Sequence, residues 1–315
     1  MYETIVYVLD RLLIATAIAS AVTWVWLLRT RTARRLPLIE PQPRRRPFWT
    51  LAEFFVCFGL PIICGLAGLR VGLQWMTPEA QELIEAGTTD ARFPAAQDQV
   101  VLIVVQFIAM LLALLSVLVW MNLISKRYLS AYGFWLSLAD LKLGVFAAFL
   151  VLPPVLLLNH LINELIAYEH PVLEMLGSQS TWQVLAMQAV MTVLLAPLYE
   201  EFTFRALLQG GAEQLIRRMK LSSGPEPQAQ EAAEVDPIPA QEVATWSWWP
   251  VLLSSTVFAS LHLAHGGGAV PIFVLALALG YLYRQTGRMG PGLVVHMLLN
   301  GLSISTLALR VWLDR

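Results

Sequence analysis

The sequence predicts an all-α, polytopic membrane protein of about eight transmembrane helices with a polar site inside the membrane. Of its 315 residues, 57% are hydrophobic and only 14% are charged, whereas soluble domains carry about 25% charged residues. The apolar residues gather in repeated runs near the length of about 20 residues that crosses a hydrocarbon core. A net charge of −1 provides no basic field, so we expect the lipid bilayer, and not a nucleic acid, as a partner.

The first four predicted spans precede the middle of the chain. An arginine-rich loop separates the first two, an acidic loop precedes the third, and a polar lead-in around Asp140 precedes the fourth. Their limits are about 5–28, 51–73, 100–124 and 143–162.

The last four predicted spans carry polar residues within apolar runs. A long polar segment separates the fifth from the sixth, and a triple glycine at 266–268 separates the sixth from the seventh. A basic turn with Arg284 and Arg288 precedes the eighth. Their limits are about 182–208, 247–264, 270–283 and 291–309. All eight spans are expected to form a single membrane domain, residues 1–315.

The distribution of positive charge predicts the orientation in the membrane. Seven arginines lie between the first two spans, and short loops rich in Lys and Arg stay in the cytoplasm. The loop 77–98 instead carries five acidic residues against the lone Arg92. We therefore expect segments 29–50 and 209–246 to be cytoplasmic and both termini to be outside. Binding of lipid headgroups by the arginines would place them on the same face.

Residues 221–245 contain no Lys, Arg or aromatic residue and are rich in Pro, Glu, Gln and Ala. Such a composition cannot bury enough apolar surface to offset the entropy of ordering. The segment therefore predicts a flexible cytoplasmic loop within the membrane domain. A simple connector is favoured over a regulatory docking role.

Two adjacent carboxylates, Glu200 and Glu201, lie near the end of the fifth span and are followed by Arg205. Ionisable groups at membrane depth are expensive and tend to mark function. On a helix, Glu201 and Arg205 share a face and can pair, whereas Glu200 is rotated by about 100°. One glutamate is thus expected to be structural and the other to carry an incompletely neutralised carboxylate, as a general base for water requires. An ion-paired packing site is the alternative.

Pro197 lies just before these carboxylates and cannot donate a backbone hydrogen bond. In an α-helix this frees the carbonyl of Val193. Pro197 is therefore expected either to open the helix beside the site or to form an ordinary kink of a membrane helix, and the two interpretations are equally good.

The sixth and eighth spans each contribute polar residues at one-turn spacing. Phe258 precedes His262 by four residues and is expected to hold its ring, and His296 precedes Asn300 by four. The last two offer donors suited to a developing oxyanion. Hydrogen bonds between helices are the alternative, but complementary polar groups on three helices favour an active site. His262 is expected nearer the outer face than Glu200, a difference in depth that a tilted or broken helix would remove.

The ordered set resembles the CPBP family of intramembrane endopeptidases, relatives of the CAAX-prenyl protease and of bacteriocin-processing and self-immunity proteins. The motifs that carry the resemblance are Glu200-Glu201-x-x-x-Arg205, Phe258-x-x-x-His262 and His296-x-x-x-Asn300. The resemblance covers a core at about 143–309. It implies a cavity open to the cytoplasm and to the bilayer.

The same resemblance implies the role of each residue. Glu200 is expected to activate water with the help of His262. The oxyanion is expected to be stabilised by His296 and Asn300. Glu201 and Arg205 are expected to support the site.

The sequence thus predicts an intramembrane endopeptidase that hydrolyses a membrane-associated protein or peptide near the cytoplasmic face. A catalytically idle scaffold of the same fold that binds partner proteins is the alternative. A transporter would be expected to show internal repeats, which this sequence lacks.

No cofactor is favoured, although zinc is considered. Glu200, His262 and His296 could supply the three protein ligands of a catalytic zinc ion. With both glutamates ionised and Arg205 charged, the cluster would carry one negative charge. A zinc ion would invert that charge in a low-dielectric setting, whereas one protonated histidine would neutralise it. We therefore expect water activated by a glutamate and no obligatory metal.

Overall fold

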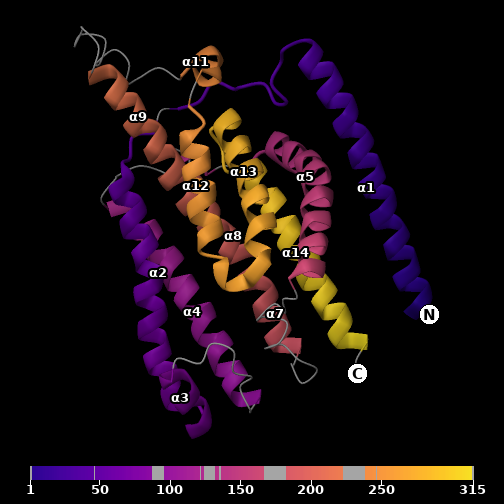
Figure 1. Cartoon of the computed structure of the whole chain (residues 1–315). Helices are drawn as coiled ribbons and strands as arrows, with labels where there is room; N and C mark the ends of the chain where they lie inside the picture. The colour runs from indigo at the N-terminus through magenta and orange to yellow at the C-terminus, as the bar shows by residue number, and fades with distance from the viewer. Residues whose placement is uncertain are drawn as a thin grey trace.

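The computed structural model describes residues 2–45, 47–86, 96–120, 122–123, 132–134, 136–166, 182–222, 238–245 and 247–313. Within these ranges the chain is helical and contains no β-strand, only an isolated antiparallel bridge between Arg44 and Ile238 (Figure 1). The predicted all-α fold class is therefore confirmed.

The helices of the first half begin at defined caps. Thr50 and Glu53 form a capping box at the start of α2, and Ser137 and Asp140 form one at the start of α5. Each box satisfies backbone N–H groups that the first helical turn leaves without partners. The elements are α1 (Tyr2–Ala33), α2 (Leu51–Gly72), η1 (Leu73–Trp75), α3 (Pro78–Glu85), α4 (Ala96–Trp120) and α5 (Leu138–Leu165).

The second half contains one continuous helical stretch, 182–222, followed by three shorter segments and two long helices. Two parts of the continuous stretch, η4 and η5, are π-helical. The elements are α7 (Trp182–Val190), η4 (Met191–Leu195), α8 (Ala196–Glu200), η5 (Glu201–Gln209), α9 (Gly210–Ser222), α11 (Ala240–Ala244), α12 (Trp249–Ser260), η6 (Leu263–Gly268), α13 (Ala269–Thr286) and α14 (Gly290–Leu313).

All eight predicted spans fall on helices, but not all of these helices meet both length and hydropathy criteria for crossing a membrane. Six stretches of the described residues do so: Arg11–Ala33, Leu51–Trp75, Gln97–Trp120, Leu138–Leu165, Trp182–Met219 and Gly266–Thr286. The predicted spans 247–264 and 291–309 are not among the six. These findings support a polytopic membrane protein.

The helix within the predicted span 247–264 is shorter than expected. This helix, α12, has 12 residues. At 1.5 Å per residue it rises by only about 18 Å, well short of a hydrocarbon core of about 30 Å. The chain turns back through η6 into α13, and Figure 1 shows this turn part-way along the bundle. His262 lies in that turn, so the helix that carries it is broken, as would be needed to bring it toward the depth of Glu200.

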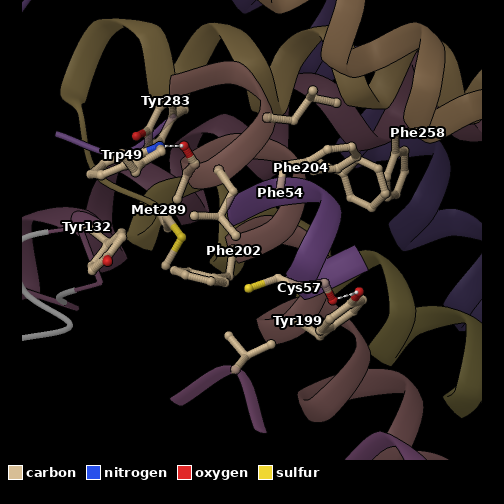
Figure 2. Close-up of a cluster of buried hydrophobic side chains, with 14 of the residues drawn as sticks. Trp49, Phe54, Cys57, Tyr132, Tyr199, Phe202, Phe204, Phe258, Tyr283 and Met289 are labelled. Carbon is tan, nitrogen blue, oxygen red and sulfur yellow. Dashed lines mark hydrogen bonds between the residues drawn. The ribbon is translucent and has the colours of Figure 1, made fainter. Parts of the chain in front are cut away.

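Prolines inside the helices mark where neighbouring helices dock. Pro61 cannot donate to the carbonyl of Cys57, and the hydroxyl of Tyr199 donates to that oxygen instead, at 2.9 Å (Figure 2). Pro154 likewise cannot donate to the carbonyl of Leu150. That oxygen accepts hydrogen bonds from two side chains of α1, Trp24 Nε1 at 2.8 Å and Ser20 Oγ at 3.4 Å. The helices thus supply hydrogen-bond donors to one another's backbone carbonyls, as segments inside a bilayer require.

The largest cluster of buried apolar side chains surrounds η5. Figure 2 shows Phe202 and Phe204 of η5 with Phe54 of α2, Phe258 of α12 and Trp49, which precedes α2. The ring centroids of Phe204 and Phe258 lie 5.1 Å apart with nearly perpendicular planes. Aromatic packing therefore holds the helix that carries the two glutamates against its neighbours.

Both termini lie at one end of the bundle, and α9 and α11 lie at the other (Figure 1). The loop between α1 and α2 shares the α9 end, because Arg44 and Ile238 exchange backbone hydrogen bonds of 3.2 and 2.8 Å. This agrees with termini on one side and segments 29–50 and 209–246 on the other; which side is cytoplasmic stays a prediction. In the segment predicted as a flexible loop, 221–222 end α9 and 238–245 contain the bridge and α11, whereas 223–237 lie outside the described residues.

Candidate active site

The helix that carries the glutamates departs twice from α-helical register. A π-helix closes its hydrogen bonds between residues five apart, one further than an α-helix, and such segments are frequent at functional sites. In η4 the N–H of Ala196 donates to the carbonyl of Met191. Glu200 ends the short α8 that follows, and Glu201 begins η5. The two carboxylates therefore lie at the junction between an α-helical and a π-helical segment.

The π register changes which carbonyl Pro197 leaves free. The residue five positions before Pro197 is Thr192, not Val193 as expected for an α-helix. Asn300 on α14 donates its side-chain amide to the carbonyl of Thr192 at 2.8 Å. One N–H of Asn300 is thereby engaged by the backbone and its orientation is set, while the amide retains a second N–H.

The ion pair expected from the spacing of Glu201 and Arg205 is present. Arg205 Nε lies 3.3 Å from Glu201 Oε2, and their side chains are 0% and 1% exposed. Arg205 Nη1 also donates to Ser254 Oγ of α12 at 3.3 Å. Burying a charge is costly unless it is paired and hydrogen-bonded. These contacts offset part of that cost for Arg205, whose Nε and Nη2 make no hydrogen bond among the described residues.

His296 of α14 lies between the two glutamates. Its Nδ1 is 3.0 Å from Glu201 Oε1, and its Nε2 is 3.4 Å from Glu200 Oε2. The Glu200 side chain is 22% exposed, against 1% for Glu201. A neutral imidazole donates from one nitrogen only, so a proton shared with Glu200 or an imidazolium is needed to serve both carboxyls. The histidine thus links the accessible glutamate to the buried one.

Phe258 of α12 joins the remaining groups through its ring. Its centroid lies 4.7 Å from the ring of His262 and 6.0 Å from that of His296, and the guanidinium of Arg205 lies 5.0 Å from it. His262 Nδ1 donates to the carbonyl of Phe258 at 2.8 Å. A backbone carbonyl only accepts hydrogen bonds, so this contact assigns the proton to Nδ1. Nε2 does not take part in it. Phe258 and its carbonyl therefore hold the His262 ring as the spacing predicted.

Two small residues that were not predicted from the sequence, Ser254 and Gly292, border the site. Ser254 is fully buried and contacts Arg205, and a Cβ atom added at Gly292 would lie 3.1 Å from Glu201 Oε2. A signal for both existed in the spacing. Ser254 precedes Phe258 by four residues and Gly292 precedes His296 by four, so each extends a predicted helix face by one turn.

The residues considered as zinc ligands do not form a recognisable metal site. Among the described residues, no group of three His, Cys, Asp or Glu side chains is placed so that it could hold a metal ion. The structure brings together five of the predicted side chains through direct contacts, namely Glu200, Glu201, Arg205, Phe258 and His296. His262 joins them through Phe258, and Asn300 lies on the same helix as His296, bonded to η4.

Comparison with known families identifies part of the chain. Residues 181–302 match the model of the family described as type II CAAX prenyl endopeptidase Rce1-like. This range is less than half of the chain, but it runs from α7 into α14 and contains all of the predicted site residues. The match bears out the resemblance to the CPBP family. The chain matches no curated protein and no solved structure.

Proposed function

We propose that this membrane protein, marked as a CAAX-protease-like peptidase by its Rce1-like domain, hydrolyses a peptide bond with water activated by Glu200. The substrate is a membrane-associated protein or peptide, cut near the cytoplasmic face. The observation that carries the proposal is the chain of contacts from Arg205 through Glu201 and His296 to Glu200, of which Glu200 is the accessible end. A packing site would not require one carboxylate to remain accessible.

The proposed division of labour follows from burial. Glu201 is paired on both oxygens, with His296 and Arg205, and its side chain is only 1% exposed. Its role is to hold the histidine and neutralise the arginine. Among the described residues Glu200 makes one ion pair, with His296 at 3.4 Å, which is long for a charge-assisted hydrogen bond and leaves its carboxylate able to bind a water molecule. Glu200 is therefore the general base.

In the proposed reaction, Glu200 removes a proton from water while the oxygen attacks the peptide carbonyl carbon. Glu200, once it holds the proton from water, no longer requires the Nε2–H of a protonated His296, which faces it at 3.4 Å. This N–H and the second N–H of Asn300, both on α14, stabilise the carbonyl oxygen as it becomes negative. The C–N bond then breaks, and Glu200 returns its proton to the leaving amine. His262 assists through Nε2, since its Nδ1 is held by the carbonyl of Phe258.

We further propose that this hydrolysis needs no metal ion. Both nitrogens of His296 face glutamate oxygens, and the site already contains a cation, Arg205, on the buried glutamate. Local positive charge for the transition state is thus available from the protein itself. A zinc ion held by Glu200, His262 and His296 would have to displace the contact between His296 and Glu201.

The experiment compares wild-type protein with Glu200→Gln, which keeps the shape of the side chain and removes the base. Peptide termini in membrane fractions of cells that express either form are identified by mass spectrometry. Purified protein in liposomes is then tested on a lipidated reporter peptide that contains the cleavage site found. Glu164→Gln, an exposed carboxyl at the end of α5, is the matched control.

We expect new termini with wild-type protein and Glu164→Gln, and none with Glu200→Gln. Equal profiles for all three proteins, with the purified wild type inactive, would leave the idle scaffold as the function. Full turnover by Glu200→Gln would show that another group activates the water.

A further inference from the structure

Two backbone carbonyls of η5 accept hydrogen bonds from side chains outside the helix. Ser254 Oγ of α12 donates to the carbonyl of Phe204 at 2.8 Å, and Trp49 Nε1 donates to the carbonyl of Ala206 at 2.8 Å (Figure 2). In α-helical register the N–H of Gly210 would bond the carbonyl of Ala206. In the structure that N–H donates to the carbonyls of Arg205 and Leu207. Trp49 thus occupies the acceptor that an α-helix would use for itself.

Trp49 is held rigidly where it makes this bond. Its side chain is buried and stacks on Tyr132, with ring centroids 4.8 Å apart and an interplanar angle of 24°. Phe48 packs edge-on against it at 5.0 Å. A Cβ atom added at Gly210 would lie 2.9 Å from Trp49 Cζ2, so the indole fills the place of a side chain at the end of η5.

Ser254 joins the backbone of η5 to the charged site. Its hydroxyl donates to the carbonyl of Phe204 and accepts from Arg205 Nη1 at 3.3 Å. Arg205 is the cation that pairs with Glu201. The adjacent Ser255 is equally buried, but its hydroxyl has no hydrogen-bond partner among the described residues.

From these contacts we propose that Ser254 and Trp49 are positioning residues that hold η5 in π-helical register and so align Glu201 with His296. This inference rests on the proposed function of the site. The Gly210 N–H does not bond the Ala206 carbonyl, as it would in an α-helix, and Trp49 supplies the donor instead. External donors to the carbonyls of Phe204 and Ala206 therefore favour the wider register. Return to α-helical register would rotate the part of η5 that follows Glu201 against α12 and move Arg205 away from Ser254. The support of Glu201 would then be disturbed, and with it the contact to His296.

The first test compares Ser254→Ala with Ser255→Ala. Both remove one buried hydroxyl from adjacent positions, but only the first removes hydrogen bonds to η5. We expect Ser254→Ala to lower kcat about three- to tenfold at unchanged KM, the loss that one or two hydrogen bonds produce. Ser255→Ala should stay within about twofold of wild type, and Ser254→Thr, which restores a hydroxyl, should recover most of the activity.

The second test uses two tryptophans that donate the same kind of bond. Trp49→Phe and Trp24→Phe each remove an indole N–H from a backbone carbonyl, that of Ala206 in η5 and that of Leu150 in α5. We expect only Trp49→Phe to lower kcat. Both variants retain an aromatic ring, so each keeps most of its packing.

A spectroscopic measurement tests the positioning without any substrate. The ¹⁵N signals of the His296 imidazole, assigned with His296→Gln, report its contacts with the two glutamates. We expect them to shift in Ser254→Ala and Trp49→Phe and to stay unchanged in Ser255→Ala and Trp24→Phe. Unchanged His296 signals in both site variants would overturn the inference. If wild-type protein hydrolyses nothing, the proposed function fails, while these signals still decide whether the residues position the site.

Discussion

Gly292 of α14 lies against the carboxylate of Glu201: a Cβ atom at position 292 would lie 3.1 Å from Oε2. That oxygen is also the partner of Arg205, and the other oxygen faces His296. The carboxylate is therefore held on three sides. It has little freedom to move away from an added methyl group.

Gly292→Ala should separate stability from activity. Alanine favours a helix over glycine by about 1 kcal/mol, which should offset part of the cost of the tight contact, so the variant should still fold. The methyl group would displace the Glu201 carboxylate by a few tenths of an ångström, and we expect kcat to fall about tenfold. Gly301→Ala on the same helix is the control, since its Cβ would meet only Val193 Cγ1 at 3.9 Å. Equal activity of both variants would contradict the tight fit at Glu201.

Glu201→Gln should mainly damage the folded protein. The substitution leaves Arg205, which is 0% exposed, without its counter-charge. Removal of one partner of a buried ion pair costs about 3–5 kcal/mol. We expect a lower yield of folded protein and a lower melting temperature in detergent, whereas Glu200→Gln should melt like wild type. Similar melting of the two variants would argue against the structural role of Glu201.

A second buried ion pair lies at the α9 end of the bundle. Arg44 Nη2 is 3.0 Å from Glu213 Oε2, with side chains only 2% and 3% exposed, and Arg44 Nη1 donates to the carbonyls of Tyr283 and Arg284. Gln209, the last residue of η5, donates to Glu213 at 3.2 Å. This arginine of the basic loop is therefore part of the protein interior and not of a solvated or lipid-binding surface.

Arg44→Gln should lower the free energy of unfolding by about 3–5 kcal/mol, because the buried Glu213 loses its counter-charge and, among the described residues, keeps only the hydrogen bond from Gln209. Arg45, the exposed neighbour of Arg44, provides the control. Arg45→Gln should change the free energy of unfolding by no more than about 0.5 kcal/mol. The double substitution Arg44→Met with Glu213→Leu removes both charges and should be less destabilising than Arg44→Gln alone. Denaturant unfolding in detergent measures all three. A double variant less stable than Arg44→Gln would contradict this account.

Activity should survive removal of metal ions. Purified wild-type protein is treated with a chelator and dialysed, and its cleavage of the reporter peptide is compared with that of untreated protein. We expect unchanged turnover and far less than one equivalent of zinc by elemental analysis. Stoichiometric zinc, together with activity lost on chelation and restored by adding the metal, would make Glu200, His262 and His296 ligands instead.

The orientation is tested by a protease site placed within 223–237. We expect cleavage only when the protease is added to the cytoplasmic side, whereas tags at either terminus should be reached from outside. The two termini serve as internal controls, since they lie at the end of the bundle opposite α9 (Figure 1). Cleavage of the 223–237 site in intact cells would reverse the predicted orientation.

Hydropathy and spacing predicted much of this architecture because both depend on local sequence. Runs of apolar residues indicate where helices lie in a bilayer, and one-turn spacing indicates which side chains share a face. The pairing of Glu201 with Arg205 and of Phe258 with His262 followed from these rules. The short α12 did not, because an apolar run does not reveal where a helix turns back within the membrane.

The sequence by itself determined a helical membrane protein, the residues of its polar site and the prolines that leave backbone carbonyls without their own donors. Only the tertiary structure decided which donors satisfy them. Thr192, freed in place of Val193 by the π register, is bonded by Asn300 of a helix that begins nearly one hundred residues later in the chain. Likewise, His296 lies between Glu200 and Glu201 because two distant helices pack together. Helical periodicity acts over a few residues, whereas the hydrogen bonds that replace water in the membrane are made by whichever helices pack side by side.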